Sequence, residues 1–239
     1  MLQGKVALVV GATGGIGSAL CARLAGAGSQ VILVGRQRDR LIQVAAGLPN
    51  PGAHTVLPTD ITDPAQVTAL FDQIGTRAGR LDVMVNAAGA GILKPWNKLG
   101  PADLEAMLAV NLKGSFYTCQ GAAQIMKEQR GGHICNVVGI LGKHTMPLAA
   151  AYSAAKFGVV GFSKCWADEW RRYGIKVTLF YFGGVDTPFW DTEQVNLKVD
   201  RTKMLRPATA ADAILFALQA EPQAVPLEIN IQPESHVFF

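Results

Sequence analysis

Short, almost continuous apolar runs recur along this chain and alternate with segments of helical period. The runs include VALVV at 6–10, VILV at 31–34, VMVN at 83–86 and VTLFYF at 177–182. A strand that is apolar on both faces has to be covered by helices on both faces, which is typical of parallel sheets. Strand, helix and strand in succession form the βαβ unit, whose crossover is right-handed. The pattern therefore predicts an α/β fold with a doubly wound parallel sheet.

The same runs indicate how many elements to expect. Seven strands are expected, near 5–10, 30–35, 53–58, 81–87, 132–138, 175–181 and 227–231. Ile16, Leu20 and Leu24 are spaced to share one face of a first helix, and two long helices are expected over 103–129 and 152–172.

Length and composition favour one folding unit. With 239 residues, 49% of them hydrophobic, the chain is long enough to bury one core, and no shift in composition marks a boundary. We therefore expect a single domain over residues 1–239. Residues 183–207 lack a regular pattern, and loops of this length in compact domains are often lids, so we expect a substrate lid there.

Charge and hydropathy exclude several classes of protein. The formal net charge is only +4, and the basic cluster at 36–40 is short and interrupted, so no nucleic-acid partner is expected. No stretch approaches the ~18 apolar residues of a membrane span, and the N-terminal run is too short for a signal peptide. We expect a cytoplasmic protein with no membrane partner.

Four widely spaced cysteines lack the paired spacing of a zinc site or a disulfide framework. They are Cys21, Cys119, Cys135 and Cys165, and each stands inside an apolar pattern. Buried free thiols and no metal are expected.

The two long helices carry aromatic residues beyond the face that a core needs, among them Phe116, Phe162 and Trp166. Such helices often pack against another subunit, so a homodimer or homotetramer is expected. An ordinary core within one domain would leave a similar trace in the sequence.

A glycine-rich turn follows the first expected strand, in the sequence VVGATGGIGSAL. Gly11, Gly15 and Gly17 permit a tight turn and a close approach of a pyrophosphate to the backbone and to free N–H groups at the helix start. As the first turn of a doubly wound chain, it predicts nucleotide binding by a Rossmann-type domain.

The end of the second strand bears on the type of nucleotide. A site for an unphosphorylated ribose would have an acid there, whereas this chain has Gly35 followed by Arg36. Glycine leaves room for a 2′-phosphate, and arginine can pair with phosphate through two hydrogen bonds. NADP(H) is therefore favoured over NAD(H), with a merely exposed arginine turn as the alternative.

Tyr152 and Lys156 stand one helical turn apart in YSAAK. With this pair and the glycine turn, the chain resembles the short-chain dehydrogenase/reductase family from end to end. The resemblance implies that Tyr152, Lys156 and Asn111 are catalytic. It also implies a set of NADP(H)-contacting residues: Gly11, Thr13, Gly15, Ile16, Gly17, Arg36, Asp60, Ile61, Asn86, Ala88, Gly89, Lys156, Gly183, Val185 and Thr187.

The implied reaction is hydride transfer between NADP(H) and a carbonyl or alcohol. Tyr152 would exchange the proton, but an unperturbed tyrosine has a pKa near ~10 and needs a neighbouring cation to ionise readily. Lys156 lies four residues on and can supply that charge. In the family, the asparagine matched by Asn111 connects the lysine to a relay water.

Gly139 occupies the position of the family's catalytic serine, thirteen residues before Tyr152. Loss of one donor to the reacting oxygen typically costs about 10²–10³ in rate. A bound water, His144 or Thr145 are alternative donors, and a bulkier substrate is an alternative reason for the glycine.

Aromatic and apolar side chains are expected to form the substrate pocket. Trp96, Met146, Phe189 and Trp190 suit an apolar or ring-containing carbonyl compound, although Phe189 and Trp190 can equally anchor the lid.

Two functions from different classes therefore remain open. The first is an NADP(H)-dependent carbonyl reductase or alcohol dehydrogenase acting on a small molecule. The second is an NADP(H)-binding regulatory or partner subunit with weak or no catalysis, which the missing serine favours. A weaker third possibility keeps the fold but changes the reaction to epimerisation or dehydration.

Overall fold

The computed structural model describes residues 2–195 and 197–235, and its strands form one parallel sheet. The strands are β1 (Val6–Val10), β2 (Gln30–Gly35), β3 (Thr55–Pro58), β4 (Val83–Asn86), β5 (Gly132–Val137), β6 (Ile175–Phe182) and β7 (Glu228–Ile231). Their spatial order is β3-β2-β1-β4-β5-β6-β7. The predicted α/β fold with a doubly wound, seven-stranded sheet is confirmed.

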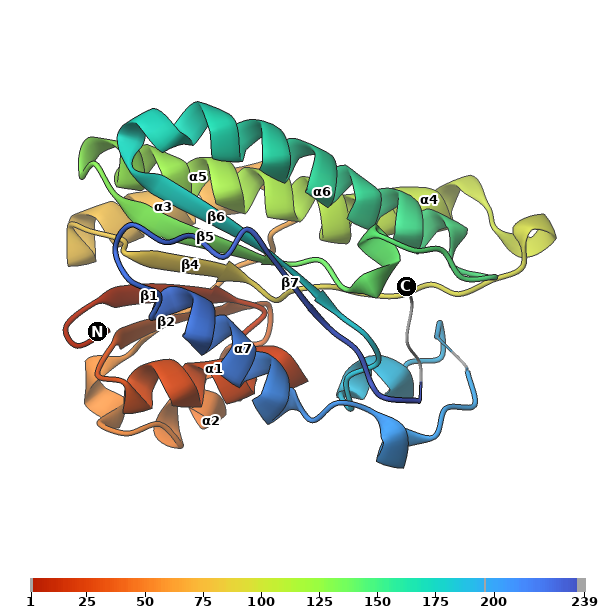
Figure 1. Ribbon diagram of the computed structural model, residues 1–239. Coiled ribbons are helices and arrows are strands. Elements are labelled where there is room, and N and C mark those ends of the chain that lie inside the picture. The colour runs from red at the N-terminus through yellow and green to blue at the C-terminus, as the bar shows by residue number, and fades with distance from the viewer. Residues whose placement is uncertain (1, 196, 236–239) are drawn as a thin grey trace.

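Helices cover both faces of the sheet (Figure 1). They are α1 (Gly15–Gly26), α2 (Arg38–Ala46), α3 (Pro64–Ala78), α4 (Pro101–Met107), α5 (Gly114–Glu128), α6 (Ala150–Trp170) and α7 (Pro207–Leu218). In Figure 1, α1, α2 and α7 lie below the sheet, and α3, α5 and α6 lie above it. None of the helices over 2–195 and 197–235 is long and apolar enough to cross a bilayer.

Strand β1 shows why both faces need a cover. Ala7 and Val9 point into the core between the sheet and helices α1 and α7. Val6, Leu8 and Val10 point into the core between the sheet and helices α3 and α5. All five side chains are buried, so a polar residue at any of them would lose its hydration. The continuous apolar run therefore encodes a strand at the centre of a three-layer fold.

The cysteines depart from the expectation in one case. Cys21, Cys119 and Cys135 are buried free thiols, but Cys165 is exposed on α6. Its neighbours along the helix are also exposed or half-buried, so position 165 lies on the outer face, away from the sheet.

The helix expected over 103–129 is divided. A π-helical segment, Leu108–Lys113, separates α4 from α5. Within it, the Asn111 Nδ2 donates to the Met107 carbonyl at 3.1 Å, so a side chain satisfies a carbonyl that a regular helix would pair with a backbone N–H. The widening is therefore coupled to the asparagine that the segment carries.

The strand order reverses at β1, whose two neighbours are β2 and β4. Ligands of open α/β sheets bind at such a switch point, outside the carboxyl ends of the strands. The segment 183–207, light blue in Figure 1, lies at that end of the sheet. A bridge between Val185 and Leu205 holds its two ends together.

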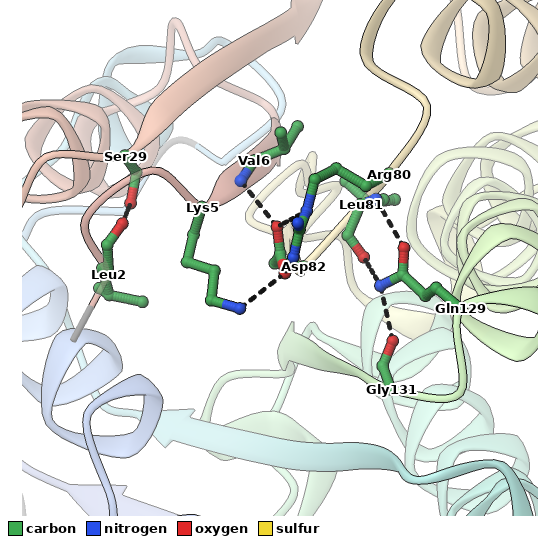
Figure 2. Close-up of polar contacts among 9 residues, drawn as sticks. All are labelled: Leu2, Lys5, Val6, Ser29, Arg80, Leu81, Asp82, Gln129 and Gly131. Carbon is green, nitrogen blue, oxygen red and sulfur yellow. Dashed lines mark hydrogen bonds and ion pairs between the residues drawn. The ribbon is translucent and has the colours of Figure 1, made fainter.

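The opposite, amino end of the sheet is held by a partly buried carboxylate (Figure 2). Asp82 accepts hydrogen bonds from the Val6 N–H at 2.9 Å, from Lys5 Nζ at 3.0 Å and from Arg80 Nε at 2.8 Å. Burial opposes ionisation of Asp82, but the bonds from Arg80, Val6 and Lys5 prevail and hold its pKa below the ordinary value. The carboxylate connects the starts of β1 and β4.

We predict that Asp82→Asn lowers the free energy of unfolding by about 1–3 kcal/mol at pH 7, because it removes the charge that these donors share. A carboxyl with a lowered folded pKa stabilises above its unfolded pKa, and loses that contribution as pH falls through the folded value. The gap in Tm between wild type and variant should therefore narrow below about pH 4. A gap that is constant from pH 7 to pH 3 would contradict the ionic role.

Candidate active site

A cavity of about 500 Å³ opens at the carboxyl end of the sheet. It lies between the first glycine turn, the loops after β4, β5 and β6, and the segment 197–204. The sequence-predicted residues among its lining are Gly15, Ile16, Ala88, Gly89, Gly139, Met146, Tyr152, Lys156, Gly183, Val185, Thr187, Phe189 and Trp190. Residues from 15 to 190 thus converge on one space.

The glycine turn packs directly on the loop after β4. Gly11 has a φ of +84°, and a Cβ there would lie 2.6 Å from the Ala88 nitrogen. A Cβ at Gly15 would lie 2.5 Å from the Thr187 methyl group. Gly14, the N-cap of α1, offers no side-chain acceptor to the N–H groups of the first helical turn. The turn therefore presents backbone donors without side chains in front of them, which fits a pyrophosphate.

The end of β2 is also open to a ligand. A Cβ at Gly35 would meet nothing closer than 3.5 Å, from Leu41, so packing does not require a glycine there. Arg36 is exposed, and no ion pair or hydrogen bond of its side chain occurs within the described part of the chain. Space and an uncommitted guanidinium at this point fit a ribose phosphate.

Tyr152 and Lys156 project from the first two turns of α6 into the cavity. The Lys156 ammonium lies 5.6 Å from the centre of the Tyr152 ring and donates to the Val137 carbonyl at 3.2 Å. Burial lowers the pKa of Lys156 to about 8 and raises the pKa of the Tyr152 hydroxyl. At pH 7 the lysine thus stays mainly charged and the tyrosine stays protonated.

Asn111 is fully buried behind this pair. Its side chain exchanges hydrogen bonds with the backbone of Ala90, donating at 3.0 Å and accepting at 3.2 Å. A Cβ at Gly89 would lie 3.1 Å from Asn111 Oδ1 and 3.7 Å from Lys156 Nζ, so the two polar groups flank one small space.

Gly139 lies beside the tyrosine hydroxyl in an unusual backbone conformation. Its φ of +80° and ψ of 164° fall in a region that is nearly restricted to glycine. A Cβ there would lie 4.0 Å from the Tyr152 hydroxyl and 3.8 Å from the Phe182 carbonyl oxygen. The cavity therefore has the space for a side chain at 139, while the backbone disfavours one.

Several sequence-predicted residues lie elsewhere. Trp96 is 87% exposed at the start of the 3₁₀ turn Trp96–Lys98 and lines a second pocket, which shares Met146 with the first. His144 follows the 3₁₀ turn Ile140–Gly142 and is not among the residues that line the cavity of Tyr152 and Lys156. The nucleotide candidates Gly11, Thr13, Gly17, Arg36, Asp60 and Ile61 also lie outside that lining, on the β1–β3 side.

Asn86 does not line the cavity and belongs instead to a buried hydrogen-bond network. Its Nδ2 donates to Asn136 Oδ1 at 2.8 Å, and its Oδ1 accepts from the Thr118 hydroxyl at 2.9 Å. Asn136 in turn donates to the Ser163 hydroxyl at 2.9 Å. This buried network joins β4, β5, α5 and α6.

Sequence reasoning missed several residues that line the cavity, most of them late in the chain. They include Leu93, Ile140, Leu141, Leu197, Lys198, Val199, Asp200, Lys203, Met204, Gln232 and Pro233. Only the lid assignment pointed toward 197–204. Nothing in the sequence around Gln232 distinguishes it from an ordinary polar residue after an edge strand.

We predict that Gly139→Ala lowers the free energy of unfolding by about 1–3 kcal/mol, because an L-residue is strained at this φ and ψ. The matched control is Gly35→Ala, whose Cβ would have ordinary contacts and whose φ lies outside the left-handed region. That change should leave Tm unchanged or raise it slightly. Equal Tm values for the two variants, measured without nucleotide, would show that the turn at 139 relaxes freely.

Comparison with known proteins identifies the family of the chain. Residues 5–197 match the family model described as short chain dehydrogenase. A D-threitol dehydrogenase of Mycolicibacterium smegmatis is 39% identical over 177 residues, covering 74% of this chain and 68% of the relative. An uncharacterized oxidoreductase of Staphylococcus aureus is 34% identical over 233 residues, covering 98% and 99%.

Solved structures have a similar fold. An actinorhodin polyketide ketoreductase with NADPH superposes with a TM-score of 0.87 at 26% identity, covering 98% of this chain and 97% of the other. An alcohol dehydrogenase of Thermococcus sibiricus, complexed with 5-hydroxy-NADP, has a TM-score of 0.89 at 24% identity, covering 99% and 100%. The glycine turn, the Tyr152–Lys156 pair and these matches together establish that the chain belongs to the short-chain dehydrogenase family of oxidoreductases.

Proposed function

We propose that this protein transfers a hydride between NADP(H) and the carbonyl or alcohol group of a small, largely apolar molecule. The observation that carries the proposal is that Tyr152 and Lys156 line the same cavity as the glycine turn. Leu93, Met146 and Phe189 give that cavity an apolar lining. The neutral tyrosine beside it is a proton donor within reach of a carbonyl oxygen.

When bound, the nicotinamide would supply the hydride, and the chain's own residues would manage the proton and the charge. Tyr152 holds its proton because burial raises its pKa, which suits donation to the oxygen of a ketone during reduction. Lys156 donates one N–H to the Val137 carbonyl, and two remain to bind a ribose hydroxyl and a water of the proton relay. Its charge opposes the cost of the phenolate that forms.

Asn111 has a positioning role in this proposal. Its carboxamide is fixed by Ala90 and Met107, and its Oδ1 faces the space that Lys156 also borders. An acceptor held at that place can orient a water that returns the proton to the tyrosine.

Gly139 leaves the reacting oxygen with one side-chain donor fewer. A loss of this kind slows the chemical step by about 10²–10³ when nothing replaces the donor. This observation favours the second candidate, an NADP(H)-binding regulatory or partner subunit with weak catalysis. Retention of Tyr152, Lys156 and Asn111 in one connected site favours the enzyme.

The relatives support the same choice. The name of the D-threitol dehydrogenase concerns oxidation of an alcohol, and the ketoreductase was solved with NADPH. Arg36 and the open position at Gly35 support NADP(H) over NAD(H) in this chain.

We also propose a homo-oligomer that uses the exposed surface along α5 and α6. Phe116, Phe162, Trp166 and Trp170 form a ladder of half-buried rings there, with centroid separations of 4.4–5.4 Å. A second copy would remove the exposed part of this aromatic surface from water, as in the interfaces of stable dimers.

Tyr152→Phe should reduce kcat by about 100-fold or more while changing the Kd for NADPH less than threefold, because only the proton donor is lost. NADPH oxidation with a panel of ketones measures the rate, and nucleotide fluorescence measures binding. Tyr117→Phe, on α5 outside the cavity, is the matched control. Equal turnover by the two variants would rule out the proposed role, whereas NADPH binding with no turnover in the wild type would favour the regulatory subunit.

Arg36→Ala should weaken NADPH binding by about 10- to 100-fold and leave NADH binding nearly unchanged, because only a 2′-phosphate uses the guanidinium. Arg40→Ala tests a neighbouring exposed arginine on α2 in the same way. Gly35→Asp should reverse the preference by placing a carboxylate at the ribose. Wild-type protein that binds NADH and NADPH equally well would contradict the assignment.

A further inference from the structure

Gly91, in the loop after β4, leaves room for an aromatic ring of the segment 183–207. A Cβ at Gly91 would lie 2.5 Å from Phe189 Cζ and 2.7 Å from Phe189 Cε2, closer than side chains approach one another. The same Cβ would lie 3.0 Å from a methyl group of Val195. The φ of Gly91 lies outside the left-handed region, so the backbone does not require a glycine there. The contact with Phe189 is therefore the main constraint on this position.

The same ring lies beside the tyrosine of the proposed reaction. The centres of the Phe189 and Tyr152 rings are 5.9 Å apart, and the ring planes meet at 51°. Both residues line the cavity of about 500 Å³. One ring thus lies between Gly91 and Tyr152, and its position depends on the absence of a side chain at 91.

Further contacts hold the Phe189 ring in place. The Leu93 N–H donates to the Gln194 carbonyl at 2.9 Å, which joins the loop after β4 to the segment that carries the ring. Phe189 also packs edge to face against Trp190, with a centroid separation of 5.2 Å. Phe189 is therefore a fixed part of the cavity wall, held by Trp190 and by its contact with Gly91.

The surroundings of Tyr152 are unequal in bulk. Phe189 fills space next to the tyrosine ring, whereas Gly139 leaves space next to the hydroxyl. A Cβ at Gly139 would lie 4.0 Å from the Tyr152 hydroxyl and would have no contact closer than 3.8 Å. A ketone whose oxygen reaches this hydroxyl has two substituents, which would meet different amounts of space. One of them has to be small, and the other has room beside Gly139.

We propose that Gly91 is a positioning residue for substrate specificity, and that it acts through Phe189. By seating the ring beside Tyr152, it restricts the reacting carbonyl to one that has a small substituent, such as methyl, on the side of Phe189. The substrate class is then an apolar methyl ketone, or the corresponding secondary alcohol, whose larger group lies toward Gly139. This inference rests on the proposed function for the identity of the reacting oxygen and its proton donor.

The test compares two isomeric ketones, 2-octanone and 4-octanone, as substrates of the NADPH complex. The isomers have the same mass, but only 2-octanone has a methyl group on its carbonyl carbon. The wild type should prefer 2-octanone by about 10- to 100-fold in kcat/KM. Phe189→Leu removes the tip of the ring and should reduce this preference to about threefold or less, mainly by improving the rate with 4-octanone.

Gly91→Ala tests the seat of the ring. The added methyl group displaces the ring tip, so the preference should change by about threefold or more. In the Phe189→Leu background the same substitution should barely alter the preference, since the atoms that it displaces are absent. Gly75→Ala, at an open position on α3, is the matched control and should leave the preference unchanged. A purely structural Gly91 would slow the reduction of both ketones alike.

Three results would overturn the inference. They are an unchanged preference in Phe189→Leu, an unchanged preference in Gly91→Ala, and an effect of Gly91→Ala that is the same with and without the ring.

Failure of the proposed function has a separate signature. If the wild type reduces no ketone, the two octanones are compared as ligands through the Tm of the NADPH complex. A larger rise with 2-octanone in the wild type, lost in Phe189→Leu, would support the wall at Phe189 without catalysis. Equal rises, or no rise with either ketone, would overturn it.

Discussion

The contact between the first glycine turn and the loop after β4 is the constraint on which the site depends. At the switch point, β1 pairs with β2 on one side and β4 on the other, so two loops leave the sheet side by side. Gly11 lies so close to Ala88 that a methyl group between them would overlap the backbone. The two loops therefore meet as bare peptide, and the side chains that could act in the chemistry come from farther along the sheet.

Burying the polar groups of those side chains lowers the stability of the fold. Lys156 is almost completely buried, yet within the described part of the chain it has one hydrogen-bond acceptor, and this burial lowers its pKa. Tyr152 likewise lies where ionisation is disfavoured. The Asn86–Asn136 network and the Asp82 carboxylate lie away from this cavity and are fully partnered. The hydrogen-bond networks that stabilise the fold therefore lie away from the cavity. The cavity itself can then hold Lys156 and Tyr152, whose polar groups have few partners.

The central strands were predictable because a strand that is buried on both faces has a continuous apolar run in its sequence. The π-helical segment at Asn111 was not, since one extra residue per turn barely alters a helical period over so few positions. The exposure of Trp96 could not be predicted either, because the sequence of a loop does not show which way the loop directs an aromatic side chain. Gln232 is hidden for a third reason. The orientation of its amide depends on the Tyr181 carbonyl and Asn230 Oδ1, which accept hydrogen bonds from its nitrogen and lie on β6 and β7.

Gly139 affects both the backbone conformation and the chemistry of the site. The missing hydroxyl and the positive φ are a single feature, because the conformation that glycine permits is one that a serine would resist. Restoring a hydroxyl at 139 therefore also changes the turn that carries Ile140 and Leu141 into the cavity wall. A serine variant consequently reports the sum of an added donor and an altered wall. The alanine variant has the same Cβ without the hydroxyl, so the difference between the two isolates the donor.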